Sequence, residues 1–198
     1  MQEYLEDLWQ RLPEDVPAPE LDARLSFLRA ELEPGDCALD LGCGDGRFTA
    51  ELAGVGSEAV GADVAQAALR RAVEHHPALR FVGVPIDGPL PFRDNRFTVV
   101  WASEVIEHVA DTGAWLSEVR RVLAPRGRLL VTTPSHGRLR LALGGIERFS
   151  PPLGDHLHLY SRGSLWRLLH EFGFGEITIR TVGGPAPVAR MLLARAVR

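Results

Sequence analysis

Three glycines stand at every second position directly after a short apolar run, in the stretch LDLGCGDGRF at residues 39–48. Glycine has no Cβ, so the backbone can turn tightly and approach a ligand closely. The N–H groups of a helix that begins after such a loop can face the same ligand. An ordinary strand-to-helix turn is the alternative, but it does not need three alternating glycines. We therefore expect a strand that runs into a ligand-binding loop.

Apolar runs and helical periodicities alternate on either side of this loop. Strands are predicted at 37–42, 58–62, 79–84, 97–102 and 128–133, and helices at 46–54, 64–75, 111–123 and 162–172. This order predicts an α/β fold with a parallel sheet covered on both faces. Near the C-terminus, EITIRTV and VARMLLARA are separated only by GGPAP. Two strands joined so tightly must be antiparallel, because a parallel pair needs a long crossover.

Two regions lie outside this alternation. Residues 2–12 and 18–32 are predicted to be helices, and the region 1–33 is expected to pack on or over the ligand site, ahead of a domain at 34–198. Residues 135–160 contain paired glycines, paired prolines and three histidines, and form a candidate substrate lid.

Charge and composition exclude several classes of protein. The formal net charge is −4, with 9 arginines against 18 acidic residues in the first 99 positions and 13 against 8 in the rest. A nucleic-acid-binding protein is usually basic, so no nucleic-acid partner is expected. No apolar run approaches the ~18 residues of a membrane span, and no signal peptide is recognisable at the N-terminus. Cys37 and Cys43 are expected to be reduced thiols, although a disulfide between them would clamp the loop, and a cytoplasmic location is expected.

Acidic residues around the loop narrow the choice of ligand. Dinucleotide-binding loops have the spacing G-x-G-x-x-G, whereas Gly42, Gly44 and Gly46 follow G-x-G-x-G beside Asp40. Carboxylates repel a pyrophosphate and attract a cation. Asp63 closes the next strand, where an acid can accept hydrogen bonds from both hydroxyls of a ribose. A ligand with a ribose and a positive charge but no phosphate is expected, which disfavours a nicotinamide oxidoreductase and fits S-adenosylmethionine.

Four segments in order resemble the class I S-adenosylmethionine-dependent methyltransferases: LDLGCGDGRF, Asp63, LPFRDNRFTVVWASEVIEHV at 90–109 and EVRRVLAPRGRLLVTTP at 118–134. The similarity is to the small-molecule branch that includes the ubiquinone and menaquinone biosynthesis methyltransferases, and it covers roughly residues 34–180. It implies a Rossmann-like, doubly wound sheet of seven strands with the last one antiparallel. It also implies S-adenosyl-L-methionine as cofactor and methyl transfer to a small-molecule acceptor by in-line displacement. The acceptor and the oligomeric state stay open.

The resemblance also assigns candidate contacts to the cofactor. The loop residues would line its methionine part, the acid after the second strand its ribose, and the next residue its adenine. The family often has an acid four residues before the leucine of LPF, where this chain has Ile86, with Asp87 one position later. The candidate cofactor-binding residues are Asp40, Gly42, Cys43, Gly44, Gly46, Asp63, Val64, Ile86, Asp87, Ser103 and Glu104. For Cys43, packing is the alternative to a contact.

Three histidines are candidates for chemistry, because imidazole titrates near neutral pH. His108 follows the fourth predicted strand, and a structural role is its alternative. His156 and His158 alternate in GDHLHLYS, so they would face the same way on an extended segment. Together with Asp155 they could form a metal cluster, but the helical H-x-x-x-H frame is missing, and no metal ion is expected.

Two other functions remain open alongside transfer to a small molecule. One is a nucleic-acid or protein methyltransferase on the same fold. Amino-directed nucleic-acid enzymes of this superfamily usually carry an acid or asparagine, two prolines and an aromatic residue after the fourth strand, where this chain has ASEVIE. The other is a non-catalytic module that binds S-adenosylmethionine, because the sequence contains no compelling general base.

Overall fold

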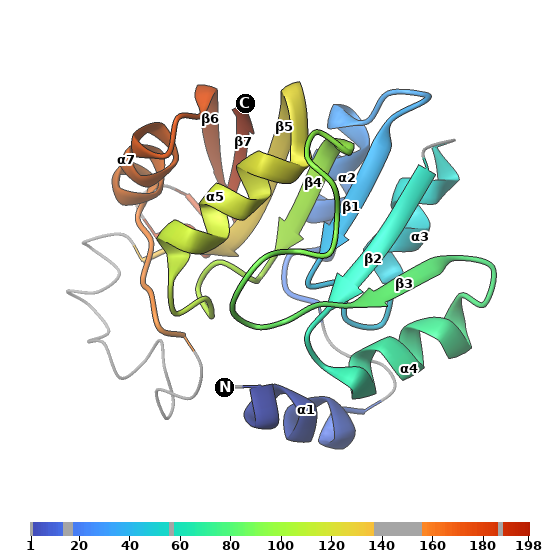
Figure 1. Ribbon diagram of the computed structural model, residues 1–198. Helices are drawn as coiled ribbons and strands as arrows, with labels where there is room; N and C mark the ends of the chain where they lie inside the picture. The colour runs from blue at the N-terminus through green and yellow to red at the C-terminus, as the bar shows by residue number, and fades with distance from the viewer. Residues whose placement is uncertain (1, 14–17, 56–57, 137–155, 186–187) are drawn as a thin grey trace.

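A computed structural model describes the chain except for residues 1, 14–17, 56–57, 137–155 and 186–187. At its centre lies one seven-stranded sheet (Figure 1). The strands are β1 (Cys37–Leu41), β2 (Glu58–Asp63), β3 (Arg80–Gly83), β4 (Phe97–Ser103), β5 (Leu123–Pro134), β6 (Gly175–Val182) and β7 (Met191–Val197). The helices are α1 (Gln2–Arg11), α2 (Leu21–Glu31), α3 (Arg47–Gly54), α4 (Gln66–His75), α5 (Thr112–Val122) and α7 (Arg162–Glu171).

The strand order is β3-β2-β1-β4-β5-β7-β6. The first five strands in this order pair in parallel, whereas β7 runs antiparallel to both β5 and β6. The predicted Rossmann-like sheet with an antiparallel last strand is therefore confirmed. The order reverses between β1 and β4, and such a switch point opens a crevice beyond the carboxyl ends of the strands. The glycine loop follows β1 and so borders that crevice.

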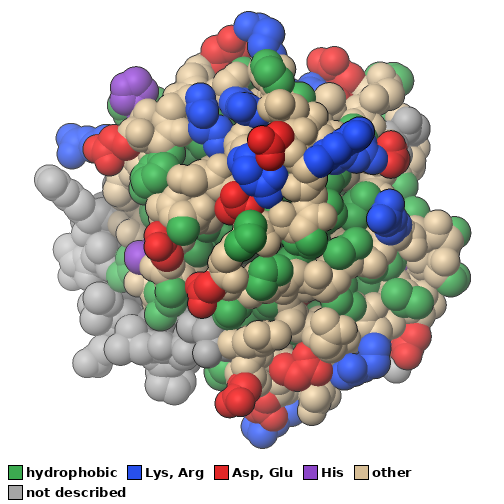
Figure 2. All heavy atoms as spheres, in the orientation of Figure 1, with side chains coloured by type: hydrophobic (Ala, Val, Ile, Leu, Met, Phe, Trp, Pro, Cys, Tyr) green, Lys and Arg blue, Asp and Glu red, His purple; other side chains and the backbone are tan. Residues whose placement is uncertain are grey.

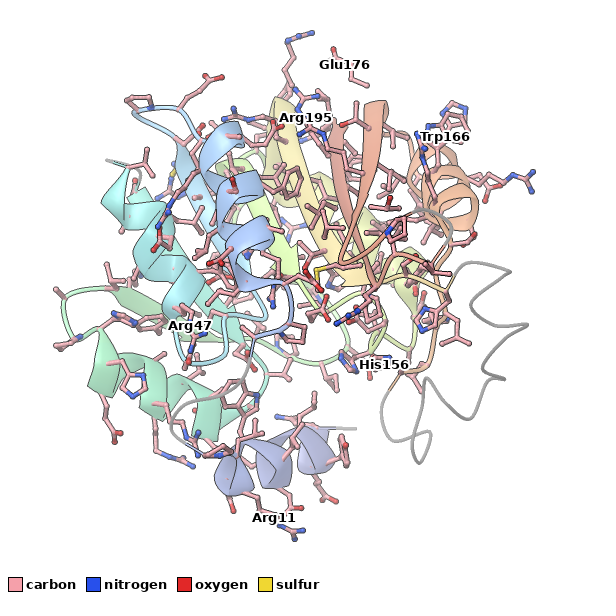
Figure 3. The ribbon with its side chains drawn as sticks, turned by 180° about the vertical axis from the view of Figure 1, so that it is seen from behind. Arg11, Arg47, His156, Trp166, Glu176 and Arg195 are labelled. Atoms are coloured by element: carbon pink, nitrogen blue, oxygen red, sulfur yellow. The ribbon has the colours of Figure 1, made fainter. Side chains whose placement is uncertain are left out.

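Helices cover both faces of the sheet, and each face has its own hydrophobic core (Figures 1 and 3). Strand β4 shows how one sequence serves both, because successive side chains of a strand point to opposite faces. Val99 and Trp101 pack with residues of α2 and α3, while Val100 packs with residues of α5 and α7. A nearly continuous apolar strand is what a sheet buried on both faces requires.

Some element boundaries differ from the sequence expectation. Helix α2 begins at Leu21 rather than at residue 18, because Glu20 has a left-handed backbone with φ 51° that a helix cannot contain. Strand β5 begins at Leu123 rather than at 128. Most of the candidate lid lies outside the described residues. Both cysteines are free thiols, and no helix in the described part of the chain is long and apolar enough to cross a membrane.

Candidate functional site

A cavity of about 850 Å³ opens at the carboxyl ends of the central strands. Helix α1 lies across this end of the sheet, where the arrows of β2 and β4 finish (Figure 1). From α1, the side chains of Leu5, Leu8 and Trp9 form part of the wall. Of the residues predicted from the sequence, the cavity is lined by Gly42, Cys43, Gly44, Asp63, Val64, Ile86, Asp87, Ser103, Glu104 and His108.

The glycine loop is close-packed against the cavity wall at two positions where only glycine fits. A Cβ on Gly42 would lie 2.3 Å from Cγ2 of Val105, and one on Gly44 would lie 2.7 Å from Cζ2 of Trp9. Both residues also have positive φ, 80° and 54°, in the left-handed region that favours glycine. Close packing and backbone conformation therefore both favour glycine at these two positions of the cavity lining.

Asp63 ends β2 and is buried at the edge of the cavity. Its two oxygens accept hydrogen bonds from the backbone N–H groups of Gly44 and Ala65, each at 2.9 Å. Burial raises the pKa of this carboxyl, and the two backbone donors oppose that rise. A carboxylate has about four acceptor positions, so Asp63 keeps acceptor capacity for a ligand while it holds the glycine loop in place.

Asp40 and Gly46 do not belong to the cavity lining among the described residues. The Asp40 carboxylate is almost fully buried and accepts a hydrogen bond from the Thr49 hydroxyl at 2.6 Å. Burial raises the pKa of Asp40 to about 7. A Cβ on Gly46 would meet the rings of Phe81 and His76. Both residues therefore shape the loop from behind.

Arg24 is a site residue that the sequence interpretation missed. It projects from α2 into the cavity wall and is only 5% exposed. Its Nε and Nη2 donate to the Ser103 hydroxyl at 3.0 and 2.7 Å, and its guanidinium lies 4.7 Å from the centroid of the Phe48 ring. Burial lowers its pKa, and the charge of Glu104 opposes this. Arg24 forms no direct ion pair with a described carboxylate, although the charges of Glu104, Glu107 and Asp40 act on it from nearby.

A signal for Arg24 was present in the sequence. Leu21, Leu25 and Leu28 mark the apolar stripe of α2, and Arg24 stands three residues after the first and four before the last. It therefore occupies the buried stripe itself. An arginine at such a position needs a partner inside the protein.

Two glutamates follow β4 and lie at or next to the wall of the cavity. Glu104 has φ 58°, an unusual backbone for a residue with a side chain, and borders the cavity. Its pKa is raised by burial. Glu107 is fully buried, and its pKa is raised further by burial and by the charge of Glu104. Strained backbone and perturbed carboxyls together are typical of functional sites.

The three candidate histidines occupy different surroundings. His108 lines the cavity. His156 lies behind it, with its ring centroid 4.9 Å from that of His108, at the end of the sheet crossed by α1 (Figure 3). The Nε2 atom of His158 lies 2.9 Å from the carbonyl oxygen of Val109. Although His156 and His158 are near in sequence, only His156 reaches the other site histidine.

The cavity also has an apolar side suited to an aromatic ring. Val64 follows Asp63, and the β3 end contributes Val84 and Ile86. Ile86 is half-buried and Asp87 is exposed, and both border the cavity. Ile86 stands where the family often has an acid, and Asp87 follows one position later. This end of the cavity is therefore lined by one apolar and one acidic side chain.

A family model described as a methyltransferase domain matches residues 6–178. The glycine/sarcosine/dimethylglycine N-methyltransferase of Actinopolyspora halophila is 31% identical over 166 residues, which cover 79% of this chain and 28% of that protein. The ubiquinone biosynthesis O-methyltransferase of Bradyrhizobium diazoefficiens is 33% identical over 115 residues, covering 55% of this chain and 45% of that one. The chain thus spans less than half the length of these curated relatives.

Among solved structures, phosphoethanolamine N-methyltransferase 2 of Haemonchus contortus in complex with S-adenosyl-L-methionine matches with a TM-score of 0.76. The identity is 16%, and the match covers 100% of this chain and 57% of that one. At this identity the likeness concerns the fold.

Proposed function

Because the chain belongs to the class I S-adenosylmethionine-dependent methyltransferases, we propose that it transfers a methyl group from this cofactor to a small-molecule acceptor. The observation that carries the proposal is the cavity wall, which combines a bare glycine loop with the buried carboxylate of Asp63 and the buried guanidinium of Arg24. Each of these three features suits a different part of the cofactor.

The residues fit S-adenosylmethionine group by group. Asp63 would accept hydrogen bonds from the ribose hydroxyls with the lone pairs that Gly44 and Ala65 leave free. Arg24 would pair with the carboxylate of the methionine part, which would give the buried cation a direct ion pair. Glu104 would face the positively charged ammonium, and Val64 would lie against the adenine.

The acceptor end of the cavity is proposed to lie near His108. When bound, the cofactor supplies an activated methyl group on a sulfonium, so the protein mainly has to align the acceptor and exclude water. The apolar residues of α1, with Trp9 against Gly44, would cover the cofactor and keep water out. His156 and His158 do not line the cavity. We propose that they support its wall through their contacts with His108 and with the carbonyl of Val109.

Several observations support a small acceptor over a macromolecule. The two curated relatives above are named for reactions on small molecules. On the face drawn in Figure 2, arginine and acidic side chains are interspersed, without the uniformly basic surface that nucleic acid favours. A cytoplasmic location is part of the proposal and is supported by the two free thiols.

The proposal is tested with S-adenosylmethionine carrying a labelled methyl group. The purified chain is incubated with panels of hydroxylated aromatic compounds, amines and carboxylic acids, and separately with bulk RNA and unfolded protein. We expect label in a small molecule with equal release of S-adenosylhomocysteine. Label in RNA or protein alone would instead support the macromolecular alternative. Cofactor binding with no transfer to any panel would support a non-catalytic module.

A further inference from the structure

Glu107, His108 and His156 lie close together at the cavity wall, although they come from two separate segments of the chain. Glu107 and His108 follow β4, and His156 lies in the stretch of chain before α7. One nitrogen or oxygen atom from each lies within 4.8 Å of the others. The backbone carbonyl of Glu107 accepts hydrogen bonds from the N–H groups of Leu157 and His158, at 2.8 and 3.1 Å, and this holds His156 beside it.

The two oxygens of the Glu107 carboxyl group have different surroundings. The side chain is 0% exposed, and its Oε2 accepts a hydrogen bond from the Thr133 hydroxyl at 2.9 Å. Its Oε1 is buried without a hydrogen-bond donor among the described residues. This atom lies 3.9 Å from Nε2 of His108. Because burying a carboxylate without a partner is costly, such a group either holds a proton or is paired or bound to a metal ion.

We propose that Glu107, His108 and His156 bind a divalent transition-metal ion, with zinc as the best fit. Two imidazole nitrogens and one carboxylate oxygen are a ligand set used by zinc in catalytic sites and by non-haem iron. Magnesium and calcium prefer oxygen ligands and fit less well. The Thr133 hydroxyl orients the carboxylate from behind and leaves Oε1 for the ion, which is the usual task of a residue behind a metal ligand.

The geometry requires a modest adjustment of side chains. Zinc binds nitrogen and oxygen at about 2.0–2.1 Å, so tetrahedral ligand atoms stand roughly 3.3 Å apart, against separations of up to 4.8 Å here. Rotation of the two imidazole side chains can supply the difference. Three protein ligands would leave a coordination position for one more ligand, and His108 lines the cavity from which that ligand could come. If the proposed function holds, an acceptor hydroxyl bound there would lose its proton more readily, with His108 as a ligand.

This site differs from the one considered in the sequence. In the sequence, the possible metal cluster consists of Asp155, His156 and His158, and no metal ion is expected at it. Asp155 lies outside the described residues, and His158 is directed to the carbonyl of Val109. The two ligands next to each other in sequence, Glu107 and His108, had no metal-binding spacing that would have revealed them.

The test is metal binding by the full chain without cofactor or acceptor, so it is independent of methyltransferase activity. Chelator-treated protein is titrated with Zn²⁺ by calorimetry, and Co²⁺ is added as a spectroscopic probe. We expect one equivalent of Zn²⁺ and visible absorption bands of four- or five-coordinate Co²⁺. His156→Ala and Glu107→Gln should abolish both signals. Thr133→Val should weaken binding about 10- to 100-fold, the usual effect behind a metal ligand.

His158→Ala is the matched control, because this histidine stands two residues from His156 in the same segment and should leave Zn²⁺ affinity unchanged. Circular dichroism checks that each variant is folded. No Zn²⁺ binding by the wild type would overturn the proposal. Equal affinity in wild type, His156→Ala and Glu107→Gln would also overturn it, since the ion would then sit elsewhere, for example at the cysteines.

Discussion

Asp40 and Asp63 are both buried aspartates beside the glycine loop, but their surroundings differ. Asp63 accepts two backbone N–H groups and borders the cavity, whereas Asp40 accepts the Thr49 hydroxyl as its one hydrogen-bond donor in the described part of the chain and lies behind the loop. The sequence predicted both as cofactor contacts on the basis of the motif. A motif gives the residue type and position, but it does not show which side of the loop a carboxylate occupies. Arg24 was missed for a different reason: it belongs to no motif, and only its place in the apolar stripe of α2 marks it as buried.

At the residue scale, we predict that Asp40 makes stability fall as pH rises. Its folded pKa of about 7 exceeds the ordinary value of 3.8, so the folded state binds the proton more tightly than the unfolded state. The stabilisation is complete below about pH 4 and is lost as pH rises through about 7. Asp40→Asn, which keeps an acceptor for Thr49, should be the more stable protein above pH 7, by roughly 4 kcal/mol at most.

Urea unfolding of wild type and Asp40→Asn from pH 4 to 8 checks this prediction. The difference between the two proteins isolates Asp40 from the other carboxyls with raised pKa. A constant difference across this range would contradict it.

At the scale of elements, the order of strands and helices could be predicted well from periodicity, because the central strands are buried on both faces and form short apolar runs, while the helices have one apolar stripe. Boundaries were less predictable. The backbone of Glu20 delays α2, and nothing in the residues before it announces a left-handed conformation. The position of α1 could not be predicted from local sequence patterns either, because it depends on contacts with residues far along the chain. Glu6 accepts the N–H of Ala67 at 3.0 Å, and Arg71 donates to the carbonyl of Leu12.

Helix α1 is predicted to matter more for ligand binding than for stability. It contains no fully buried residue, yet its apolar side chains line the cavity and Glu6 caps α4. Deletion of residues 2–12 should lower the free energy of unfolding by only about 1–2 kcal/mol, mainly through the lost cap. It should weaken S-adenosylmethionine binding by about tenfold or more.

Glu6→Ala is the matched control, because it removes the cap and leaves the apolar wall in place. It should reproduce most of the stability loss with little change in affinity. If the deletion left cofactor affinity unchanged in calorimetry, α1 would not be a cover for the site.

At the scale of the whole molecule, a buried ion pair lies at one end of the sheet and the ligand cavity at the other. Asp36 precedes β1, and both of its oxygens accept hydrogen bonds from Arg128 within β5, at 2.6 and 2.7 Å. Both side chains are largely buried, 6% and 12% exposed. The sequence indicated which elements form the sheet, but apart from the C-terminal hairpin it did not indicate which strands are neighbours, since pairs such as this one join residues 92 positions apart.

Asp36→Ala is therefore predicted to reduce the free energy of unfolding by about 1.5–3 kcal/mol, because the largely buried Arg128 would lose its two hydrogen bonds to this carboxylate and keep only the exposed Glu33 carboxylate and the Glu31 carbonyl as described partners. Cofactor affinity should stay within about twofold of the wild type under conditions where the variant is folded. Glu31→Ala, which breaks a more exposed pair with Arg195, is the control and should cost less than about 1 kcal/mol. A parallel loss of affinity in Asp36→Ala would show that the two ends are coupled.

The central claim is that the cavity beyond β1 and β2 binds S-adenosylmethionine through Asp63. It is tested most directly by calorimetric titration of wild type and Asp63→Ala with S-adenosylmethionine and S-adenosylhomocysteine. Wild type should bind both ligands, and Asp63→Ala should bind about ten- to a hundredfold more weakly, since hydrogen bonds to a charged group contribute about 1.5–3 kcal/mol. No binding by the wild type, or equal affinity in Asp63→Ala, would contradict the account.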